Sequence, residues 1–163
     1  MNEKNIQLEI KNTAVENRVT KLENEVFELK PIPGCQDYKI LDNPKRKASY
    51  ATPKNEWKCD QTGYSKISPD WKGAGWYRFH ETVGFSIPEE TVEGVHCGVH
   101  GSGWLQDKHP VRIGETKNAT VCFNNGSSGI CNWSTTIKIR QCGSYYIYHL
   151  PDAPICHVGY CAE

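Results

Sequence analysis

One short segment combines side chains that proteins use to bind ligands. Residues 75–80 (GWYRFH) place Trp76, Tyr77 and Phe79 around Arg78. Aromatic rings attract cations and stack on other flat groups, and a guanidinium donates paired hydrogen bonds to anions. Side chains in an extended strand alternate between two faces, so Trp76 and Arg78 share one of them. We therefore take Trp76 and Arg78 as a candidate ligand face, with a strand of a packed core as the alternative.

Metal binding and catalysis find little support in the remaining residues. His96, Cys97 and His100 have the spacing of zinc ligands, since imidazole nitrogen and thiolate sulfur both bind zinc. A cysteine within a disulfide cannot bind a metal, so we expect surface histidines, no metal site and no cofactor. The sequence has no G-x-S-x-G or H-E-x-x-H motif and no phosphate-binding glycine loop. An even number of cysteines leaves no thiol free as a nucleophile, and we expect no enzymatic activity.

Cysteines and glycosylation sequons indicate a secreted protein. The chain has eight cysteines, all after residue 34: Cys35, Cys59, Cys97, Cys122, Cys131, Cys142, Cys156 and Cys161. Asn-x-Ser/Thr sequons without a middle proline begin at Asn118, Asn125 and Asn132. Disulfides persist in oxidising compartments, so this combination predicts a secreted or extracellular glycoprotein whose cysteines are all paired. A cytosolic protein with reduced cysteines is the alternative, and the sequence leaves the connectivity open.

The charge and hydropathy of the chain exclude several partners. Its 163 residues include 19 Lys and Arg and 19 Asp and Glu, which gives a formal net charge of zero. Nucleic-acid-binding proteins and proteins drawn to anionic membranes usually carry a basic excess, so we expect neither partner. No apolar run approaches the roughly 20 residues that span a bilayer. The segment MNEKNIQLEI lacks the apolar core of a signal peptide, so we expect a signal sequence upstream of it.

Residues 1–30 contain no cysteine, glycine or proline and follow a seven-residue repeat. This repeat predicts a parallel α-helical coiled-coil stalk that oligomerises through its a and d positions. Asn12 at an a position favours a dimer, but residues 18–23 resemble the R-h-x-x-h-E pattern of short parallel trimers. We favour a homotrimer, with a dimer, or an amphipathic helix packed on its own domain, as alternatives. The predicted oligomerisation residues are Leu8, Asn12, Val15, Arg18, Val19, Leu22, Glu23, Val26 and Leu29.

From residue 31 onward, turns and short strands replace the helical pattern. Residues 31–34 (PIPG) combine proline, which has no amide donor, with a turn-forming glycine, and predict a hinge. Residues 135–141 (TTIKIRQ) alternate with period two, and residues 144–150 (SYYIYHL) are a second run of β-formers. Residues 142–144 between them are a plausible hairpin connection.

The predicted fold is mostly β (small α+β): a disulfide-rich globular head at residues 35–163 behind the stalk and hinge. Residues 41–58 are polar and basic, and we interpret them as a long surface loop closed by Cys35 and Cys59 or their partners. We expect Cys156 and Cys161 to tie the end of the chain to the body of the head.

The head resembles the eight-cysteine domain of the family that includes uromodulin and the major glycoprotein of pancreatic zymogen granules. The resemblance runs from Cys35 to Cys161 through an ordered series of landmarks. They are Cys35-Gln-Asp37-Tyr38, Leu41-Asp42, Cys59-Asp60, Gly75–Phe79, Ile87-Pro88-Glu89, His96-Cys97-Gly98, Gly103-Trp104-Leu105, His109-Pro110, Val121-Cys122-Phe123, Cys131-Asn132-Trp133, Arg140-Gln-Cys142, Tyr146-Ile-Tyr148, Pro154-Ile-Cys156 and Tyr160-Cys161.

The departures from this family limit what the resemblance implies. The uromodulin version has a further cysteine where Glu90-Thr91 stand here, and another beside Cys131. The resemblance implies that those two form a bridge, whose joint loss leaves the remaining eight evenly paired. Family members display N-glycans that bacterial fimbrial lectins grip. The matching stretches here, residues 104–106 and 148–151, contain no sequon, so a decoy role would depend on glycans at other positions.

Together these observations predict a secreted, non-enzymatic glycoprotein for multivalent recognition or decoy binding. Its head domains, displayed on the stalk, would bind an extracellular protein or glycan ligand on microbes or cell surfaces. The alternative is a structural subunit of an extracellular filament, matrix or coat. A soluble oligomer with a ligand would favour the first function, and a self-associating surface the second.

Overall fold

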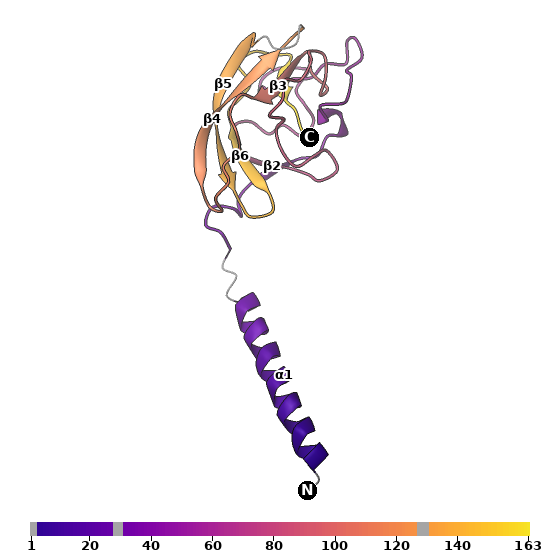
Figure 1. Ribbon diagram of the computed structural model, residues 1–163. Coiled ribbons are helices and arrows are strands. Elements are labelled where there is room, and N and C mark those ends of the chain that lie inside the picture. Colours follow the sequence, from indigo (N-terminus) through magenta and orange to yellow (C-terminus); the bar gives the residue numbers. More distant parts are fainter. Residues whose placement is uncertain (1–2, 28–30, 127–130) are drawn as a thin grey trace. The chain divides into compact units, whose positions relative to one another are not determined.

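The computed structural model describes residues 3–27, 31–126 and 131–163, with the backbone alone for residues 22–27. The chain divides into two compact units, Met1–Pro31 and Ile32–Glu163. The first contains α1 (Glu3–Phe27), and the second, which we call the head, contains the strands and the short 3-10 helix η1 (Pro44–Arg46) (Figure 1). The prediction of a mostly β, disulfide-rich domain with a helix is confirmed. Within the described ranges, no helix is both long and apolar enough to cross a bilayer.

In the described part of the head, seven strands form one mixed sheet in the order β1-β2-β6-β5-β4-β3-β7. The edge pairs β1–β2 and β3–β7 are parallel, and the other four pairs are antiparallel. The strands are β1 (Lys39–Leu41), β2 (Gly75–Phe79), β3 (Gly101–Leu105), β4 (Thr116–Asn124), β5 (Trp133–Gln141), β6 (Tyr146–Leu150) and β7 (Val158–Tyr160). The predicted hairpin is confirmed, since β5 and β6 pair through a turn at Gly143, whose φ of 85° suits glycine.

Period-two alternation gives the sheet one buried and one open face. In β4 and β5 the odd-numbered apolar residues Ala119, Val121, Ile137 and Ile139 are buried, whereas Asn118, Thr136 and Lys138 between them are exposed. The buried face packs against the loops that connect the strands, with Trp71, Val83, Ile87 and Ala153 in the same core. The long connections thus cover one face of the sheet, as Figure 1 shows, and leave much of the other to solvent.

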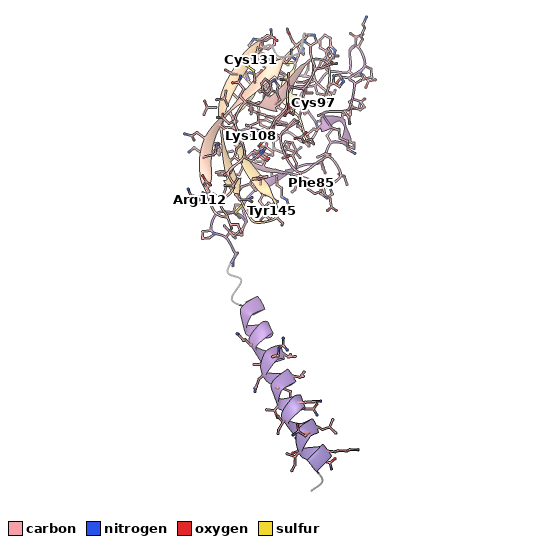
Figure 2. All side chains as sticks on the ribbon, in the orientation of Figure 1. Phe85, Cys97, Lys108, Arg112, Cys131 and Tyr145 are labelled. Carbon is pink, nitrogen blue, oxygen red and sulfur yellow. A yellow bond between two sulfur atoms is a disulfide. The ribbon has the colours of Figure 1, made fainter. Side chains whose placement is uncertain are left out.

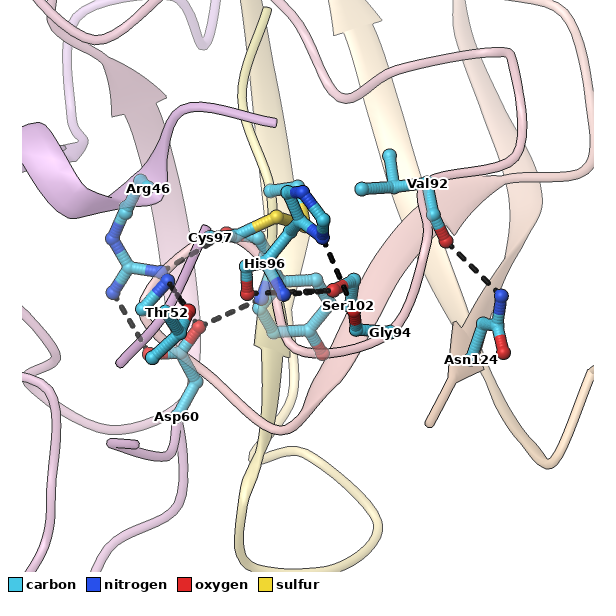
Figure 3. Close-up of a disulfide and its surroundings, with 12 residues drawn as sticks. Arg46, Thr52, Asp60, Val92, Gly94, His96, Cys97, Ser102 and Asn124 are labelled. Carbon is cyan, nitrogen blue, oxygen red and sulfur yellow. Dashed lines mark hydrogen bonds and ion pairs between the residues drawn. A yellow bond between two sulfur atoms is a disulfide. The ribbon is translucent and has the colours of Figure 1, made fainter. Parts of the chain in front are cut away.

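Six of the eight cysteines form disulfides. The pairs are Cys35–Cys142, Cys97–Cys161 and Cys122–Cys131, and Figure 3 shows the surroundings of the second. Cys161 therefore ties the end of the chain to the loop before β3. Cys59 and Cys156 are thiols whose Sγ atoms lie 2.7 Å apart.

The prediction that residues 41–58 form a long surface loop closed by Cys35 and Cys59 or their partners was wrong at Arg46, although most of the segment is exposed or half-buried. Cys35 bonds to Cys142 instead, and Arg46, in the middle of the segment, is only 2% exposed. The Arg46 guanidinium donates hydrogen bonds to the carboxylates of Asp60 and Asp70 at 2.7–2.8 Å and to the carbonyl of Tyr160 at 3.1 Å. Figure 3 shows Arg46 beside Asp60. A basic segment is expected to be solvated, but a charged side chain can be buried where its partners are buried with it.

The carboxylates keep this arginine charged. Burial alone would lower the pKa of Arg46, but Asp60 and Asp70 outweigh it and raise the pKa above its ordinary value. Burial likewise opposes ionisation of Asp70, yet the hydrogen bond from Arg46 lowers the pKa of that carboxyl. The cluster therefore folds as a charged network that joins residues 46, 60 and 70 to β7.

Removing Arg46 should be more destabilising than removing any surface charge. Arg46→Gln leaves two buried carboxylates without their cation, and breaking a buried ion pair from one side typically costs about 3–5 kcal/mol. Denaturant titration monitored by tryptophan fluorescence would measure the free energy of unfolding. Lys45→Gln is the matched control, because the exposed pair of Lys45 with Glu56 should leave the midpoint unchanged. Equal free energies of unfolding for Arg46→Gln and the parent would show that the buried ion pairs of Arg46 do not stabilise the head.

We predict that Cys59 and Cys156 form a fourth disulfide in the secreted protein. Their sulfur atoms are already closer than two unbonded sulfurs pack, and losing a native bridge typically costs about 2–5 kcal/mol. Non-reducing peptide mapping should recover a linked peptide containing both residues, and Cys59→Ser should lower the melting temperature. Alkylation must follow denaturation, because burial raises the pKa of the Cys59 thiol to about 12. Recovery of both residues as free thiols would contradict the prediction.

Candidate functional site

Strand β2 places the two residues of the predicted ligand face as the alternation requires. Tyr77 and Phe79 enter the core with 0% and 2% exposure, whereas Trp76 and Arg78 lie half-buried on the opposite face. We call this surface the outer face. We define it by these outward side chains of β2, β6, β5 and β4 and two tyrosines beside them: Tyr38, Trp76, Arg78, Thr116, Asn118, Thr136, Lys138, Arg140, Tyr145 and His149. The outward Ile147 is buried under the Cys35–Cys142 bridge.

Two tyrosines hold Arg78 in place. Its guanidinium carbon lies 3.9 Å from the ring centroid of Tyr145 and 5.9 Å from that of Tyr38. Arg78 Nη1 donates to the Tyr38 hydroxyl at 3.2 Å, and the Tyr145 hydroxyl donates to the carbonyl of Cys35 at 2.8 Å. The planar cation is therefore fixed against aromatic rings that are anchored near the Cys35–Cys142 disulfide.

A second arginine, Arg140, packs its guanidinium against the Trp76 ring. The guanidinium carbon of Arg140 lies 5.4 Å from the Trp76 ring, and His149 meets the same ring edge-on at 5.3 Å. Arg140 donates to the Thr116 hydroxyl at 2.7 Å and to the carbonyl of Pro33 at 3.1 Å. A side chain at Gly34, where φ is +76°, would collide with this guanidinium. The glycine of the predicted hinge is therefore also required for the placement of Arg140.

Trp76 and Arg78 are evident from residue type, whereas their neighbours on the outer face were not predicted. Lys138 and Arg140 occupy even positions of TTIKIRQ, the positions that its apolar alternation directs away from the core. The β5–β6 hairpin places Lys138 opposite His149. The register of the predicted hairpin could therefore have placed Lys138 and His149 on the same face. An open groove of ≈ 380 Å³ borders Trp76, and its other lining residues are Gln36, Asp37, Tyr38 and Lys39.

The three sequon asparagines lie in two places. Asn118 is exposed on the outer face in β4. Asn125 is half-buried and Asn132 exposed where β4 and β5 meet, and the Asn125 amide donates to the side-chain oxygen of Asn132 at 3.0 Å. Figure 2 shows Cys131, next to Asn132, at the opposite end of the sheet from Tyr145. Ser127 of the middle sequon falls outside the described residues.

The histidine and cysteine spacing that suggested zinc serves other purposes. Cys97 is bonded to Cys161, and His96 Nδ1 contacts the carbonyl of Gly94 at 3.1 Å. The ring centroids of His100 and His157 each lie 5.0 Å from the ring centroid of Trp57. Over the ranges the structure describes, His, Cys, Asp and Glu form no cluster of three that could hold a metal.

Glu89, His109 and Tyr148 form a hydrogen-bonded chain that resembles a catalytic relay. His109 Nδ1 lies 2.6 Å from Glu89 Oε1 and His109 Nε2 lies 2.9 Å from the Tyr148 hydroxyl. The neutral imidazole with its proton on Nδ1 satisfies both contacts, since it donates to the carboxylate and accepts from the phenol. Tyr148 is 0% exposed, so no substrate reaches its hydroxyl, and the chain instead fastens the loop after β3 to β6.

Burial and hydrogen bonding shift the pKa values of His109 and Glu89. Burial lowers the pKa of His109 and outweighs the opposing effect of Glu89. Hydrogen bonds, first from Lys108 and then from the His109 amide, lower the pKa of Glu89 to about 2. Both shifts favour the deprotonated form in the folded state.

Stability should therefore fall as the solution is acidified. The unfolded chain binds a proton at His109 near its ordinary pKa of 6.5 while the folded protein resists it, so stability declines below that pH. Glu89 adds a second loss as the pH falls from its ordinary 4.5 toward 2. Melting temperatures measured from pH 8 to 3 should show both steps, and His109→Gln should flatten the upper one. An unchanged slope above pH 5 in that variant would contradict the role of His109.

Comparison with known proteins agrees with this architecture. Residues 77–162, about half of the chain, match the family of uromodulin-like eight-cysteine domains. The chain is 30% identical over 130 residues to the pancreatic secretory granule membrane major glycoprotein GP2 of Canis lupus familiaris, covering 79% of this chain and 23% of that protein. It is 32% identical over 116 residues to uromodulin of Mus musculus, covering 71% of this chain and 18% of that protein.

These similarities concern the head, since the chain spans less than a quarter of the length of the curated relatives it matches. They confirm the predicted secreted or extracellular location, because one relative is named for a secretory granule and the disulfides need an oxidising compartment. The ordered cysteine and aromatic landmarks, the disulfide-rich sheet and the match over residues 77–162 lead to one conclusion. The chain belongs to the family of uromodulin-like eight-cysteine domains.

Proposed function

We propose that the protein is a non-enzymatic recognition glycoprotein that acts as an oligomer. Its stalk, residues 1–30, assembles as a parallel coiled coil and, through the hinge at residues 31–34, presents several copies of the head at residues 35–163. The heads bind an extracellular protein or glycan ligand through the outer face. The observation that carries this proposal is the row of solvent-exposed apolar side chains along α1.

The apolar side chains of α1 need a partner. Leu8, Val15 and Val19 are 58%, 59% and 47% exposed, and they recur with the spacing of a coiled-coil seam. Asn12 and Arg18 lie on the same exposed helix. A helix of 25 residues is about 37 Å long, and helices only somewhat shorter are marginal in water without packing. Burial between copies supplies that packing, and we favour a trimer over a dimer. The side chains of Leu22, Glu23 and Val26, and Leu29 as a whole, lie outside the described residues.

Oligomerisation would suit the chemistry of the outer face. An open surface with aromatic-stacked cations offers contacts that are individually weak in water. Linking several such surfaces raises the overall affinity by roughly 10² to 10⁴ where the geometry permits simultaneous binding. Glycans on Asn118, Asn125 or Asn132 would add a second mode of recognition, in which microbial lectins bind the glycans as decoys.

A structural subunit of an extracellular assembly is the second candidate. The observation that favours it is a set of exposed apolar side chains on the head: Val111 is 85%, Ile113 68% and Phe85 66% exposed. Such residues are common singly on protein surfaces, but Val111 and Ile113 are neighbours in one loop. Contacts between heads through this loop would build an assembly without a soluble ligand.

The two candidates differ in what happens to the protein in the presence of cells. The secreted, glycosylated protein would be tested for binding to bacteria and cell surfaces before and after enzymatic removal of its N-glycans. Binding lost with the glycans supports a decoy, and binding that persists supports recognition by the protein surface. Growth of larger assemblies with no binding in either state would favour the structural subunit.

The stalk can be tested independently of any ligand. Light scattering should give a mass near three times the 18.5 kDa of the chain, before adding glycans. Val15→Asp places a charge in the predicted seam and should yield monomers. Ile10→Asp is the matched control, because Ile10 is 58% exposed on the same helix but lies outside the a and d positions, so the oligomer should persist. A monomeric parent would contradict the coiled coil.

A further inference from the structure

The acidic residues of the chain are absent from its sheet. Although the chain contains 19 Asp and Glu, none lies in the seven strands of the described part, which carry instead Lys39, Arg78, Lys117, Lys138 and Arg140. Arg78, Lys138 and Arg140 belong to the outer face, and no described carboxylate is paired with any of the three. A chain with zero net charge therefore presents one locally cationic surface.

The strand register arranges this surface in a row. Asn118 pairs with Lys138 across β4–β5, Lys138 with His149 across β5–β6, and His149 with Trp76 across β6–β2. Strands in a sheet lie about 4.8 Å apart, so the row extends for roughly 14 Å. Arg140 follows Lys138 two residues along the same strand, about 7 Å away on the same face. The cations are thus spread over an open surface instead of converging on a pocket.

The aromatic rings serve here to orient cations. The Tyr145 ring lies against Arg78, and the Trp76 ring has Arg140 and His149 as its neighbours. A site that stacks nucleic-acid bases needs aromatic faces that are free. Guanidiniums held in this way are suited to bidentate hydrogen bonds with anionic oxygens, because little side-chain entropy remains to be lost on binding. The hydroxyls of Thr116 and Thr136 add neutral hydrogen-bonding groups on the same face.

We propose that the outer face binds a linear sulfated polysaccharide of the glycosaminoglycan type. The inference deepens the proposed recognition function and rests on it. Sulfate groups repeated along an extended chain match cations spread across neighbouring strands, and the open face accepts a polymer without an enclosing pocket. Binding is electrostatic in origin and therefore weakens as salt is added.

The position of Asn118 adds a consequence. It stands at one end of the row, one strand from Lys138, so a glycan attached there starts beside the proposed site. That glycan covers part of the face and reduces access for a polysaccharide. Asn118→Gln should therefore strengthen binding by the glycosylated protein, whereas Asn132→Gln, at the end of the sheet near Cys131, should leave it unchanged.

The test uses the full secreted chain and a heparin-derived octasaccharide on a biosensor at low and at physiological salt. The double variant Lys138→Glu with Arg140→Gln removes three units of charge from the face and should weaken binding by roughly tenfold or more. Lys47→Gln with Lys54→Gln is the control, because both residues are exposed on the 42–58 segment and neither belongs to the outer face, and its binding should match the parent. Arg140 also donates a hydrogen bond to the carbonyl of Pro33, so its replacement could disturb the fold. The single variant Lys138→Glu is therefore included, because Lys138 has no described partner and the variant should fold normally.

The outcomes separate this proposal from the oligomer. In the Val15→Asp variant the loss of avidity should weaken binding, but the remaining binding should still depend on Lys138. Binding of the parent that is insensitive to Lys138→Glu would overturn the site even if the stalk assembles. Equal binding of chemically desulfated octasaccharide, or of single-stranded DNA, would overturn the ligand class.

Discussion

The fork of hydrogen bonds from Arg46 to Asp60 and Asp70 is the constraint on which the head depends. The chain between β1 and β2 is long and contains little regular structure beyond η1, so strand pairing cannot hold it. The arginine connects both carboxylates to the carbonyl of Tyr160, and Asp60 accepts the Tyr160 amide in return. A segment near the start of the head is thereby fixed to its last strand. Because every group in this network is buried, losing one member would leave its partners buried without their charge or hydrogen bond.

The loops and the Arg46 network cover only the inner side of the sheet, so the other face remains open to solvent. The loops, the core aromatics and the Arg46 network occupy the inner side. On the outer side, the segment that enters the head from Ile32 is held by the Cys35–Cys142 bridge, which packs with Ile147. The same bridge anchors Tyr145 and, through it, Arg78. The disulfide is therefore part of the support of the outer face as well as a restraint on the fold.

The sequence was informative where local pattern decides structure and silent where long-range pairing does. Period-two alternation in GWYRF and TTIKIRQ gave the correct faces of β2 and β5, and the turn at Gly143 could be predicted because glycine permits it. The burial of Arg46 could not, since its partners lie 14 and 24 residues away in loops without periodicity. The parallel edge pairs β1–β2 and β3–β7 were equally inaccessible, because they join segments with no shared turn. For the outer face, Trp76 and Arg78 were evident from residue type, whereas His149 acquires significance only when the register places it between Lys138 and Trp76.

If the outer face binds a polyanion as proposed, the net charge of a small domain is a poor guide to its partners. A neutral total argues against a field that extends over the whole molecule, but a ligand responds to charges within about a Debye length, roughly 8 Å at physiological salt. Within the sheet itself, the seven strands contribute no carboxylate beside Lys138 and Arg140. The remaining interaction is weak for a single head, because exposed cations retain most of their hydration. Under the proposed function, selectivity for an extended anionic ligand depends on repeating the face, and the proposed coiled coil of α1 would provide that repetition.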